Sequence, residues 1–286
     1  MKKSLTQILL VIVLSVFVGA SAQAADKTLN MGVMQWTCES LPSMVIKYAL
    51  EEKLGYKVKT EDMFEWGVSF AALTKGDVDF MLGEPSFVQN DYWDKSKDKL
   101  EIVSPMGYGL YQALAVPGYV GIDSMEELNA HKDQFDGKII GIEAGSGLMR
   151  QTRDAVNAYG LDLKLVEGST AAMNSALKSA IDKNKWIVVT SWTPTWWHQK
   201  YNIKFLNDPK GIYPKAVPQH IMATKGFANE HPQAAAFLRA IYIPLDDILL
   251  MSSWVKDGSS VDEAAQRWCR ENAKTLDRWA ALANVK

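Results

Sequence analysis

Cysteine and histidine are scarce in this chain of 286 residues, which contains two of the first and four of the second. Two widely separated cysteines are too few for a structural zinc site, whose ligands are clustered cysteines and histidines. The histidines are scattered over segments that we expect to be helices or loops, so the sequence favours the solvated surface for them. They are His131, His198, His220 and His231.

The signature motifs of several enzyme classes are also missing. The chain has no G-x-S-x-G nucleophile elbow, no H-E-x-x-H zinc-protease motif and no P-loop. Its Gly-Ser-Gly run at 145–147 does not extend to the G-x-G-x-x-G fingerprint of dinucleotide-binding proteins. The sequence therefore predicts neither catalytic activity nor a cofactor.

Charge of one sign is not in excess. Lysine and arginine number 31 and aspartate and glutamate 33, which gives a net charge of −2. Removal of Lys2 and Lys3 with an N-terminal signal leaves 29 basic residues against 33 acidic ones, and the net charge becomes −4. Such mild acidity argues against nucleic acid or an anionic membrane surface as a partner.

Long hydrophobic runs are missing except at the N-terminus. Residues 8–18 are nearly all apolar, but this run is shorter than the roughly 18–20 residues that a membrane span needs. Lys2 and Lys3 precede it, and Ala22-Gln23-Ala24 follows with the small-x-small pattern of a cleavage site. We therefore interpret residues 1–24 as a cleaved signal peptide. No cysteine directly follows the run, so we expect a mature chain that is free in the periplasm.

The two cysteines, Cys38 and Cys269, are a candidate disulfide in such an oxidising compartment. The alternative is two buried thiols. The sequence gives no distance between them, so both possibilities stay open at this point.

The mature chain repeats one order of elements twice. Apolar runs and helical periodicity predict strands at 28–33, 56–61 and 78–82, with helices at 40–54 and 68–75 between them. The same signals recur later in the chain. They predict strands at 138–142, 163–166 and 186–190, and helices at 146–159 and 170–183.

Two such β-α-β-α-β units predict an α/β fold with two three-layer lobes. About 260 mature residues are enough for both. We expect residues 25–115 and 218–286 to form the first lobe and residues 116–217 the second. A strand at 114–117 leaves the first lobe, and a strand at 218–224 with a helical tail returns to it. Two crossings make a hinge that can close on a ligand.

Four loops follow the first and third strands of the two units. Loops at the carboxyl ends of parallel strands meet at one edge of a sheet, so these four should line a single cleft between the lobes. They are residues 36–39, 83–86, 143–147 and 191–197.

Tryptophans in two of these loops are candidate ligand contacts. Trp36 and Trp192 come from equivalent loops of opposite lobes and can face each other across an alkylammonium group, which gains roughly 0.5–2 kcal/mol from each indole face. The alternative is that each is core or hinge packing. Of Trp196 and Trp197, one is expected to face the cleft and one to pack on the lobe, and Trp196 is included as a candidate.

Polar groups in the other loops supply further candidates. Gly145 and Ser146 open a helix whose free N–H groups suit an anion or a carbonyl, although a plain N-cap at Ser146 is the alternative. Glu84 follows a buried strand and either faces the ligand or stabilises the lobe from a solvated position. If it faces the ligand, that ligand should carry positive charge or an N–H or O–H donor.

Several runs of residues resemble the glycine betaine/choline-type substrate-binding proteins of ABC importers. The resemblance covers essentially the whole mature chain. It is carried by GDVD at 76–79, QALAVPGYV at 112–120, GIEAGSGLM at 141–149, YGLDLKLVEGSTAAMNSALKSAI at 159–181, WIVVTSWTPTWW at 186–197 and KFLNDPKG at 204–211.

The resemblance implies a type II periplasmic-binding-protein fold that closes on a quaternary ammonium compound caged by aromatic side chains. Trp36 and Trp192 fall where family members place cage tryptophans, and Glu39 falls where choline binders carry an acidic residue. Gln112 lies in one of the matching runs and is a further candidate.

The chain departs from the family pattern at two positions. Thr195 replaces a histidine that in some members helps to hold the ligand carboxylate. Glu84-Pro85 stands where choline-type members carry another cage tryptophan. The class of ligand is therefore implied, while its identity stays open.

These observations predict the periplasmic substrate-binding subunit of an ABC importer for glycine betaine, choline or a similar compound. We expect a monomer that works with a membrane permease and an ATPase and that has no cofactor. The alternatives are a binder of a cationic or zwitterionic amino acid with the same fold, a secreted enzyme acting on small amines, and a sensor that presents its ligand to a chemoreceptor.

Overall fold

The computed structural model describes residues 27–85 and 89–283 of the chain. The predicted signal peptide lies outside these ranges. Within them, no helix combines the length and the apolar character that a membrane crossing requires.

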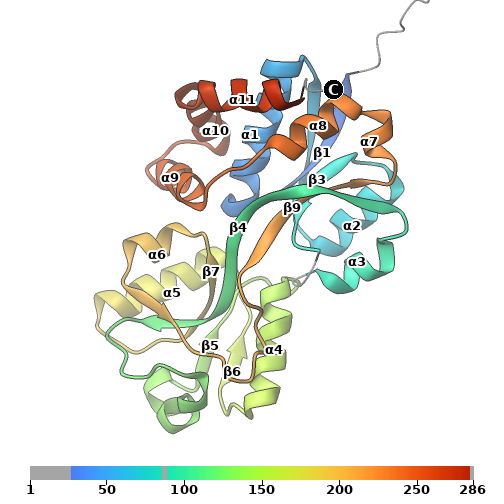
Figure 1. Ribbon diagram of the computed structural model, residues 1–286. Coiled ribbons are helices and arrows are strands. Elements are labelled where there is room, and N and C mark those ends of the chain that lie inside the picture. Colours follow the sequence, from blue (N-terminus) through green and yellow to red (C-terminus); the bar gives the residue numbers. More distant parts are fainter. Residues whose placement is uncertain (1–26, 86–88, 284–286) are drawn as a thin grey trace, which may run out of the picture.

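The first predicted unit is present and forms a parallel sheet in the order β2-β1-β3. Its elements are β1 (Thr28–Met34), α1 (Thr37–Leu54), β2 (Lys57–Met63), α2 (Trp66–Lys75) and β3 (Phe80–Gly83). We call the part of the molecule built around these strands lobe 1. It is the upper part of Figure 1.

The second predicted unit is also present and repeats this topology in the order β7-β5-β6. Its elements are β5 (Lys138–Ile140), α4 (Gly147–Tyr159), β6 (Lys164–Val166), α5 (Thr170–Asp182) and β7 (Val189–Thr193). We call the part built around these strands lobe 2. Both third strands begin two to three residues later than the apolar runs suggested.

Two long strands join the lobes. β4 (Leu100–Pro117) pairs antiparallel with β9 (Val217–Thr224) up to Leu110, and from Tyr111 onward it pairs with β7. The partner thus changes between Leu110 and Tyr111, whereas the expected lobe boundary falls after residue 115. Figure 1 shows β4 running from one lobe into the other, so that all strands belong to one curled sheet.

The remaining elements complete the two lobes. Lobe 1 is covered by α3 (Asn90–Ser96) and by the predicted helical tail, and lobe 2 carries two short 3-10 helices, one short helix and one short strand. The tail comprises α7 (Phe227–Glu230), α8 (Pro232–Ala240), α9 (Leu245–Lys256), α10 (Val261–Glu271) and α11 (Ala273–Ala283). The additions to lobe 2 are η1 (Met125–Glu127), η2 (Asn129–Phe135), α6 (Trp196–Lys200) and β8 (Ile203–Phe205).

Local sequence signals account for the ends of several helices. Ser146 and Ser169 cap α4 and α5, because each side chain accepts a hydrogen bond from a backbone N–H of the first turn. Ser260 and Glu263 form a capping box at the start of α10. Gly55 ends α1 in the left-handed conformation that favours glycine.

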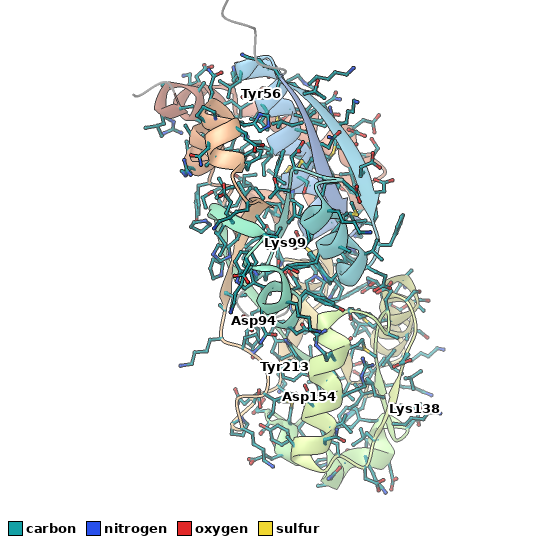
Figure 2. All side chains as sticks on the ribbon, turned by 90° about the vertical axis from the view of Figure 1, so that its right-hand side faces the viewer. Tyr56, Asp94, Lys99, Lys138, Asp154 and Tyr213 are labelled. Atoms are coloured by element: carbon teal, nitrogen blue, oxygen red, sulfur yellow. The ribbon has the colours of Figure 1, made fainter. Side chains whose placement is uncertain are left out.

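Each lobe has its own hydrophobic core. The core of lobe 1 joins α1, the inner face of its strands and the C-terminal helices, and the core of lobe 2 lies on its strands beneath α4 and α5. In the view at right angles (Figure 2), the lobes lie one above the other, with Tyr56 in one and Lys138 in the other. The two lobes are thus separate packing units that the β4–β9 ribbon connects.

The structure decides the state of the two cysteines. Both are buried and unpaired, so the candidate disulfide is wrong and the alternative of two buried thiols holds. Cys38 lies in the first turn of α1, whereas the Cys269 sulfur lies 3.9 Å from the carbonyl of Val45, two turns further along that helix. Seven helical residues span about 10 Å, which is beyond the reach of a disulfide.

Candidate functional site

A cavity of about 610 Å³, a volume that includes space open to solvent, lies between the lobes at the carboxyl ends of the strands. Both lobes contribute side chains to it, as the position of the four loops predicts. Lobe 1 supplies Trp36, Cys38, Glu39, Trp66, Glu84, Gln89 and Val217. Lobe 2, with its part of β4, supplies Tyr111, Gln112, Ile142, Ser146, Gly147, Leu148, Trp192, Thr193 and Pro214. Leu110 lies at the junction of the lobes.

Six of the eight candidate binding residues line this cavity. The six are Trp36, Glu39, Glu84, Gln112, Ser146 and Trp192. Gly145 and Trp196 are not among the residues that line it.

Trp196 lies outside the cavity because α6 begins at this residue and directs it away. Its ring packs edge-on against Trp197 and lies under the ammonium group of Lys256 from α9, at 5.0 Å. Trp197 is the inward member of the pair and is buried, but it packs behind Trp192 rather than on the cavity surface.

Gly145 serves the approach of the two lobes. A Cβ atom at this position would lie 2.2 Å from a carboxylate oxygen of Glu65, which stands at the start of α2 in lobe 1. The absence of a side chain at Gly145 lets the loop of lobe 2 come close to that carboxylate.

Several lining residues were not expected from the sequence, among them Trp66, Gln89 and Tyr111. Trp66 belongs to a hydrophobic core of lobe 1, but it also forms part of the cavity wall and stacks on Trp36 with ring centroids 5.9 Å apart. The predicted cleft loops follow only the first and third strands of each unit, whereas Trp66 opens α2 just after β2, the second strand. Gln89 and Tyr111 carry no motif, and Tyr111 lies in the part of β4 that the sequence did not reveal.

The aromatic walls come from both lobes. Trp36 and Trp66 form the wall of lobe 1, and Trp192 forms the wall of lobe 2 with Trp197 edge-on behind it, at 4.9 Å between ring centroids. Trp192 is paired with Gln112 across β7 and β4, which places both side chains on the same face of the sheet.

Helix geometry places an acidic residue next to the first of these walls. The carbonyl of Trp36 accepts hydrogen bonds of 2.8 Å from the backbone N–H groups of Glu39 and Ser40 at the start of α1. Trp36 and Glu39, three residues apart, therefore lie on the same side of the helix start. Glu39 is 4% exposed and Glu84, from the loop after β3, is 5% exposed.

Glu39 and Glu84 form a buried pair of carboxyl groups. Burial raises the pKa of Glu39 well above its ordinary value, and the neighbouring Glu84 raises it further and hydrogen-bonds to it. Burial also raises the pKa of Glu84, while hydrogen bonds from Glu39 and Gln89 act in the opposite direction. Two carboxyl groups that are buried side by side do not both ionise readily, so the pair favours sharing one proton.

Gln89 fixes the Glu84 member of the pair. The backbone N–H of Glu84 donates to the Gln89 side-chain oxygen at 2.8 Å, and the Gln89 amide donates to the Glu84 carboxylate. Gln89 is fully buried, so this clamp holds the Glu84 side chain toward the cavity.

Cys38 borders the carboxyl pair as a protonated thiol. Burial raises its pKa strongly and the neighbouring carboxyl groups of Glu39 and Glu84 raise it further, while a hydrogen bond with the Trp192 side chain acts in the opposite direction. The part of the chain that the structure describes contains no cluster of three or more residues able to hold a metal ion.

The first turn of α4 supplies positive potential from the side of lobe 2. The Ser146 hydroxyl accepts a 3.2 Å hydrogen bond from the N–H of Met149, and Gly147 and Leu148 line the cavity beside it. The first N–H groups of a helix have no partner within it and its dipole favours negative charge. The cavity thus combines a carboxylate from lobe 1 with a helix N-terminus from lobe 2.

All four histidines, which we expected at the solvated surface, are only partly exposed. Burial lowers the pKa of His198 to about 4 and also lowers the pKa of His220. Both rings are therefore neutral near pH 7. His198 lies in α6 and His220 lies in β9, and their scattered positions in the sequence did not reveal this burial.

Comparison with known proteins gives one family for almost the whole described chain. The family model described as the substrate-binding domain of ABC-type glycine betaine transport systems, OpuAC, matches residues 27–271. A glycine betaine/carnitine transport binding protein, GbuC, of Listeria monocytogenes is 37% identical over 150 residues, which cover 51% of this chain and 50% of that protein. A glycine betaine/proline betaine-binding periplasmic protein of Salmonella typhimurium is 23% identical over 94% of this chain and 96% of its own.

A solved structure shares the architecture. Lactococcal OpuAC, crystallised in a closed conformation with glycine betaine, superposes with a TM-score of 0.82 and 30% sequence identity. The superposition covers 89% of this chain and 99% of that one. The predicted type II periplasmic-binding-protein fold is confirmed.

Proposed function

The chain belongs to the family of substrate-binding domains of ABC-type glycine betaine transport systems, and on this premise we propose that it is the substrate-binding subunit of an ABC importer for a quaternary ammonium compound. The observation that supports the proposal most directly is the cavity, in which tryptophans from opposite lobes stand beside a buried carboxylate.

The aromatic walls supply attraction for an alkylammonium group. A cation between Trp36 and Trp192 faces the electron-rich side of each indole, and each contact is worth roughly 0.5–2 kcal/mol, more where water is excluded. Closure of the lobes around the β4–β9 ribbon brings the two walls together. The ligand is therefore held only when both lobes contribute.

The carboxyl pair narrows the ligand class within this proposal. A carboxylate of the pair compensates one positive charge, and the protonated carboxyl group beside it is a hydrogen-bond donor. A ligand with net positive charge and a hydroxyl or N–H group, such as choline or a partly methylated amine, satisfies this wall. Glycine betaine adds a carboxylate, which must then lie at the N-terminus of α4 to avoid the pair.

Family membership supports a proposal for partners and location. We propose that the bound ligand is delivered to a membrane permease with its ATPase and that the protein acts in the periplasm, the location that the name of the Salmonella relative gives for that protein. We propose that it works as a monomer and as a carrier without catalytic activity.

A second candidate function is the binding of a cationic or zwitterionic amino acid. The carboxylate of Glu84 suits an ammonium group, and the start of α4 suits an α-carboxylate. The aromatic walls favour a methylated ammonium over a free one, because a free ammonium loses more hydration in an apolar cage.

A thermal-shift and calorimetry panel tests the choice of ligand. The panel contains choline, glycine betaine, carnitine, proline and a basic amino acid, each added to the mature protein. A true ligand at 100-fold over Kd should add about 2.7 kcal/mol to the free energy of unfolding. Stabilisation by the basic amino acid alone would favour the second candidate, and no stabilisation by any quaternary compound would refute the proposal.

Replacement of Trp192 by Ala tests the walls. We expect the affinity for the best ligand to fall at least tenfold, because loss of one desolvated cation–π face costs on the order of 2 kcal/mol. Trp254→Ala is the matched control, since Trp254 lies on α9 against Arg267 and not at the cavity. Unchanged affinity in a folded Trp192→Ala protein would contradict the aromatic cage.

A further inference from the structure

We propose that His198 and Ser191 are positioning residues that hold the Trp192 wall of the cavity in place through Trp197. Neither residue is among those that line the cavity, so neither touches the ligand. The inference rests on the proposed function in one respect only, namely that Trp192 is a wall against which a ligand packs.

Three contacts connect His198 to the wall. The Nε2 atom of His198 lies 2.8 Å from the Ser191 hydroxyl, and the indole N–H of Trp197 donates to the same hydroxyl at 3.0 Å. The Trp197 ring then meets Trp192 edge-on, with centroids 4.9 Å apart and an interplanar angle of 86°. A displacement of Ser191 or His198 is thereby transmitted to the ring that forms the wall.

Burial constrains which groups donate and which accept in the hydrogen bonds between Trp197, Ser191 and His198. Ser191 is fully buried, and its hydroxyl already accepts the proton of the Trp197 indole. The His198 ring is neutral near pH 7 because burial lowers its pKa to about 4. We assign the ring proton of His198 to Nδ1, so that the Ser191 hydroxyl donates to Nε2, because this tautomer satisfies every polar atom between the two side chains.

His198 also supports a second part of the cavity wall. Its ring stacks on Phe205 of β8 at 4.6 Å, and Phe205 meets Tyr111 edge-on at 4.8 Å. Tyr111 lines the cavity. A flat, neutral ring with one acceptor nitrogen is thus needed between Phe205 and Ser191, and histidine meets both requirements whereas phenylalanine meets only the first.

The Ser191–His198 pair has the spacing of a nucleophile and its base, but its position favours a supporting role. Ser191 is fully buried and its hydroxyl is occupied on both sides, by Trp197 and by His198. A nucleophile needs access to a substrate atom at about 3 Å, which this hydroxyl lacks.

The test uses His198→Phe, which keeps the stacking on Phe205 and removes the acceptor, and Ser191→Ala, which removes the hydroxyl. The matched control is His131→Phe, because His131 is also in lobe 2 and packs on an aromatic ring, that of Trp186, away from the cavity. Indole N–H signals of ¹⁵N-tryptophan-labelled protein report on the rings without ligand. The signals of Trp192 and Trp197 are assigned from single Trp→Phe variants.

We expect His198→Phe and Ser191→Ala to shift the Trp192 and Trp197 indole signals in the ligand-free protein. Each should weaken quaternary ammonium binding about three- to tenfold, the effect of one hydrogen bond. The double variant should lose no more affinity than the single variant that binds the ligand more weakly, because both substitutions break the same series of contacts. His198→Gln, which restores an acceptor, should recover most of the affinity, and His131→Phe should leave both signals and affinity unchanged.

Two results would overturn the inference. One is a His198→Phe protein that unfolds at a lower temperature while its Trp192 signal and its affinity stay at wild-type values, which is the outcome for a residue that only fills the core. The other is full additivity of the two single changes. Should His198→Phe fail to fold, Ser191→Ala and His198→Gln decide by the same measurements. Failure of the wild type to bind any quaternary ammonium compound would refute the proposed function, while the Trp192 signal would still decide on the positioning chain.

Discussion

At the scale of the residue, Glu84 sets the charge of the cavity. Its Gln89 clamp keeps a carboxylate buried beside a second carboxyl group, an arrangement that costs stability unless a cation occupies the site. We expect Glu84→Gln to raise the melting temperature of the ligand-free protein. Affinity for choline should fall on the order of tenfold, because a hydrogen bond or contact to a charged group is worth roughly 1.5–3 kcal/mol.

Glycine betaine is the matched comparison in this experiment, because it shares the trimethylammonium group and carries no net charge. Calorimetry of wild type and Glu84→Gln with both ligands separates the two effects. Equal losses for choline and glycine betaine, or none for either, would show that Glu84 does not determine selectivity.

Glu39 makes the stability of the folded protein depend on pH. The folded protein keeps a proton on this raised-pKa carboxyl above the ordinary value of 4.5, where the unfolded chain releases it. Its stabilising contribution is therefore complete below about pH 4.5 and is lost as the pH rises through the raised pKa. Glu39→Gln removes this dependence.

The measurement is thermal unfolding of wild type and Glu39→Gln from about pH 5 to pH 8. The melting temperature of Glu39→Gln minus that of the wild type should increase as the pH rises. The contribution of His198 to the pH dependence of stability has the opposite sign, because its pKa is lowered in the folded protein. Its stabilising contribution is lost as the pH falls below the ordinary pKa of 6.5. The comparison of the two proteins cancels that contribution, and a difference that stays constant with pH would contradict the shared proton.

At the scale of the element, the sequence was sufficient wherever a local pattern determines the structure. Both β-α-β-α-β units follow from periodicity and from caps such as Ser146 and Gly55, and the loops after β1, β3, β5 and β7 follow from the topology of parallel sheets. The strand β4 was largely missed. Its central part, Ser104–Gln112 with Gly107 and Gly109, lacks alternation because its pairing with β9 is interrupted by register shifts.

The positions of Trp66, Trp196 and His198 could not be predicted for a related reason. Each depends on contacts between segments that are distant in the chain, such as Trp196 with Lys256 or His198 with Phe205. A pattern in one segment carries no information on the direction in which its neighbour in space lies. Most candidate residues that follow strand ends line the cavity because the fold alone brings those ends together, but Gly145 and Trp196 do not.

The first turn of α4 allows stability and binding to be separated. Ser146→Ala and Ser169→Ala each remove an N-cap, since Ser146 accepts from Met149 at 3.2 Å and Ser169 from Ala172 at 3.1 Å. Both should lower stability by about 1 kcal/mol. Only Ser146 lines the cavity, so only its replacement should also change ligand affinity. Equal effects of the two changes on affinity would remove α4 from the binding site.

At the scale of the whole molecule, contacts at both sides of the cavity hold the lobes together. Arg150 of α4 lies 3.1 Å from a carboxylate oxygen of Asp91 and 5.7 Å from the ring centroid of Tyr92, both in α3 of lobe 1. On the other side, Lys256 of α9 lies over Trp196 of α6. Figure 1 shows α9 and α6 facing each other across the gap between the lobes. Because these contacts join one lobe to the other, opening of the lobes would break them.

Asp91→Asn should therefore shift the protein toward the open arrangement. The Arg150–Asp91 pair is partly exposed, so its contribution to closure is at most about 1 kcal/mol. That amount corresponds to a two- to fivefold change in the balance of open and closed forms. Under the proposed function the ligand is held between the closed lobes, so its dissociation should become faster by a similar factor, and the radius of gyration of the ligand-free protein should increase.

Asp94→Asn is the matched control for this prediction. Asp94 lies on the same helix and pairs with Lys97 at 3.0 Å, but both partners belong to lobe 1 and do not cross the cavity. Small-angle scattering and stopped-flow dissociation should therefore distinguish the two variants. High salt should reduce the difference, because exposed ion pairs are screened. If Asp91→Asn and Asp94→Asn dissociate the ligand at the same rate, closure depends on the ligand and on the aromatic contacts, and the ion pair at the rim contributes nothing to it.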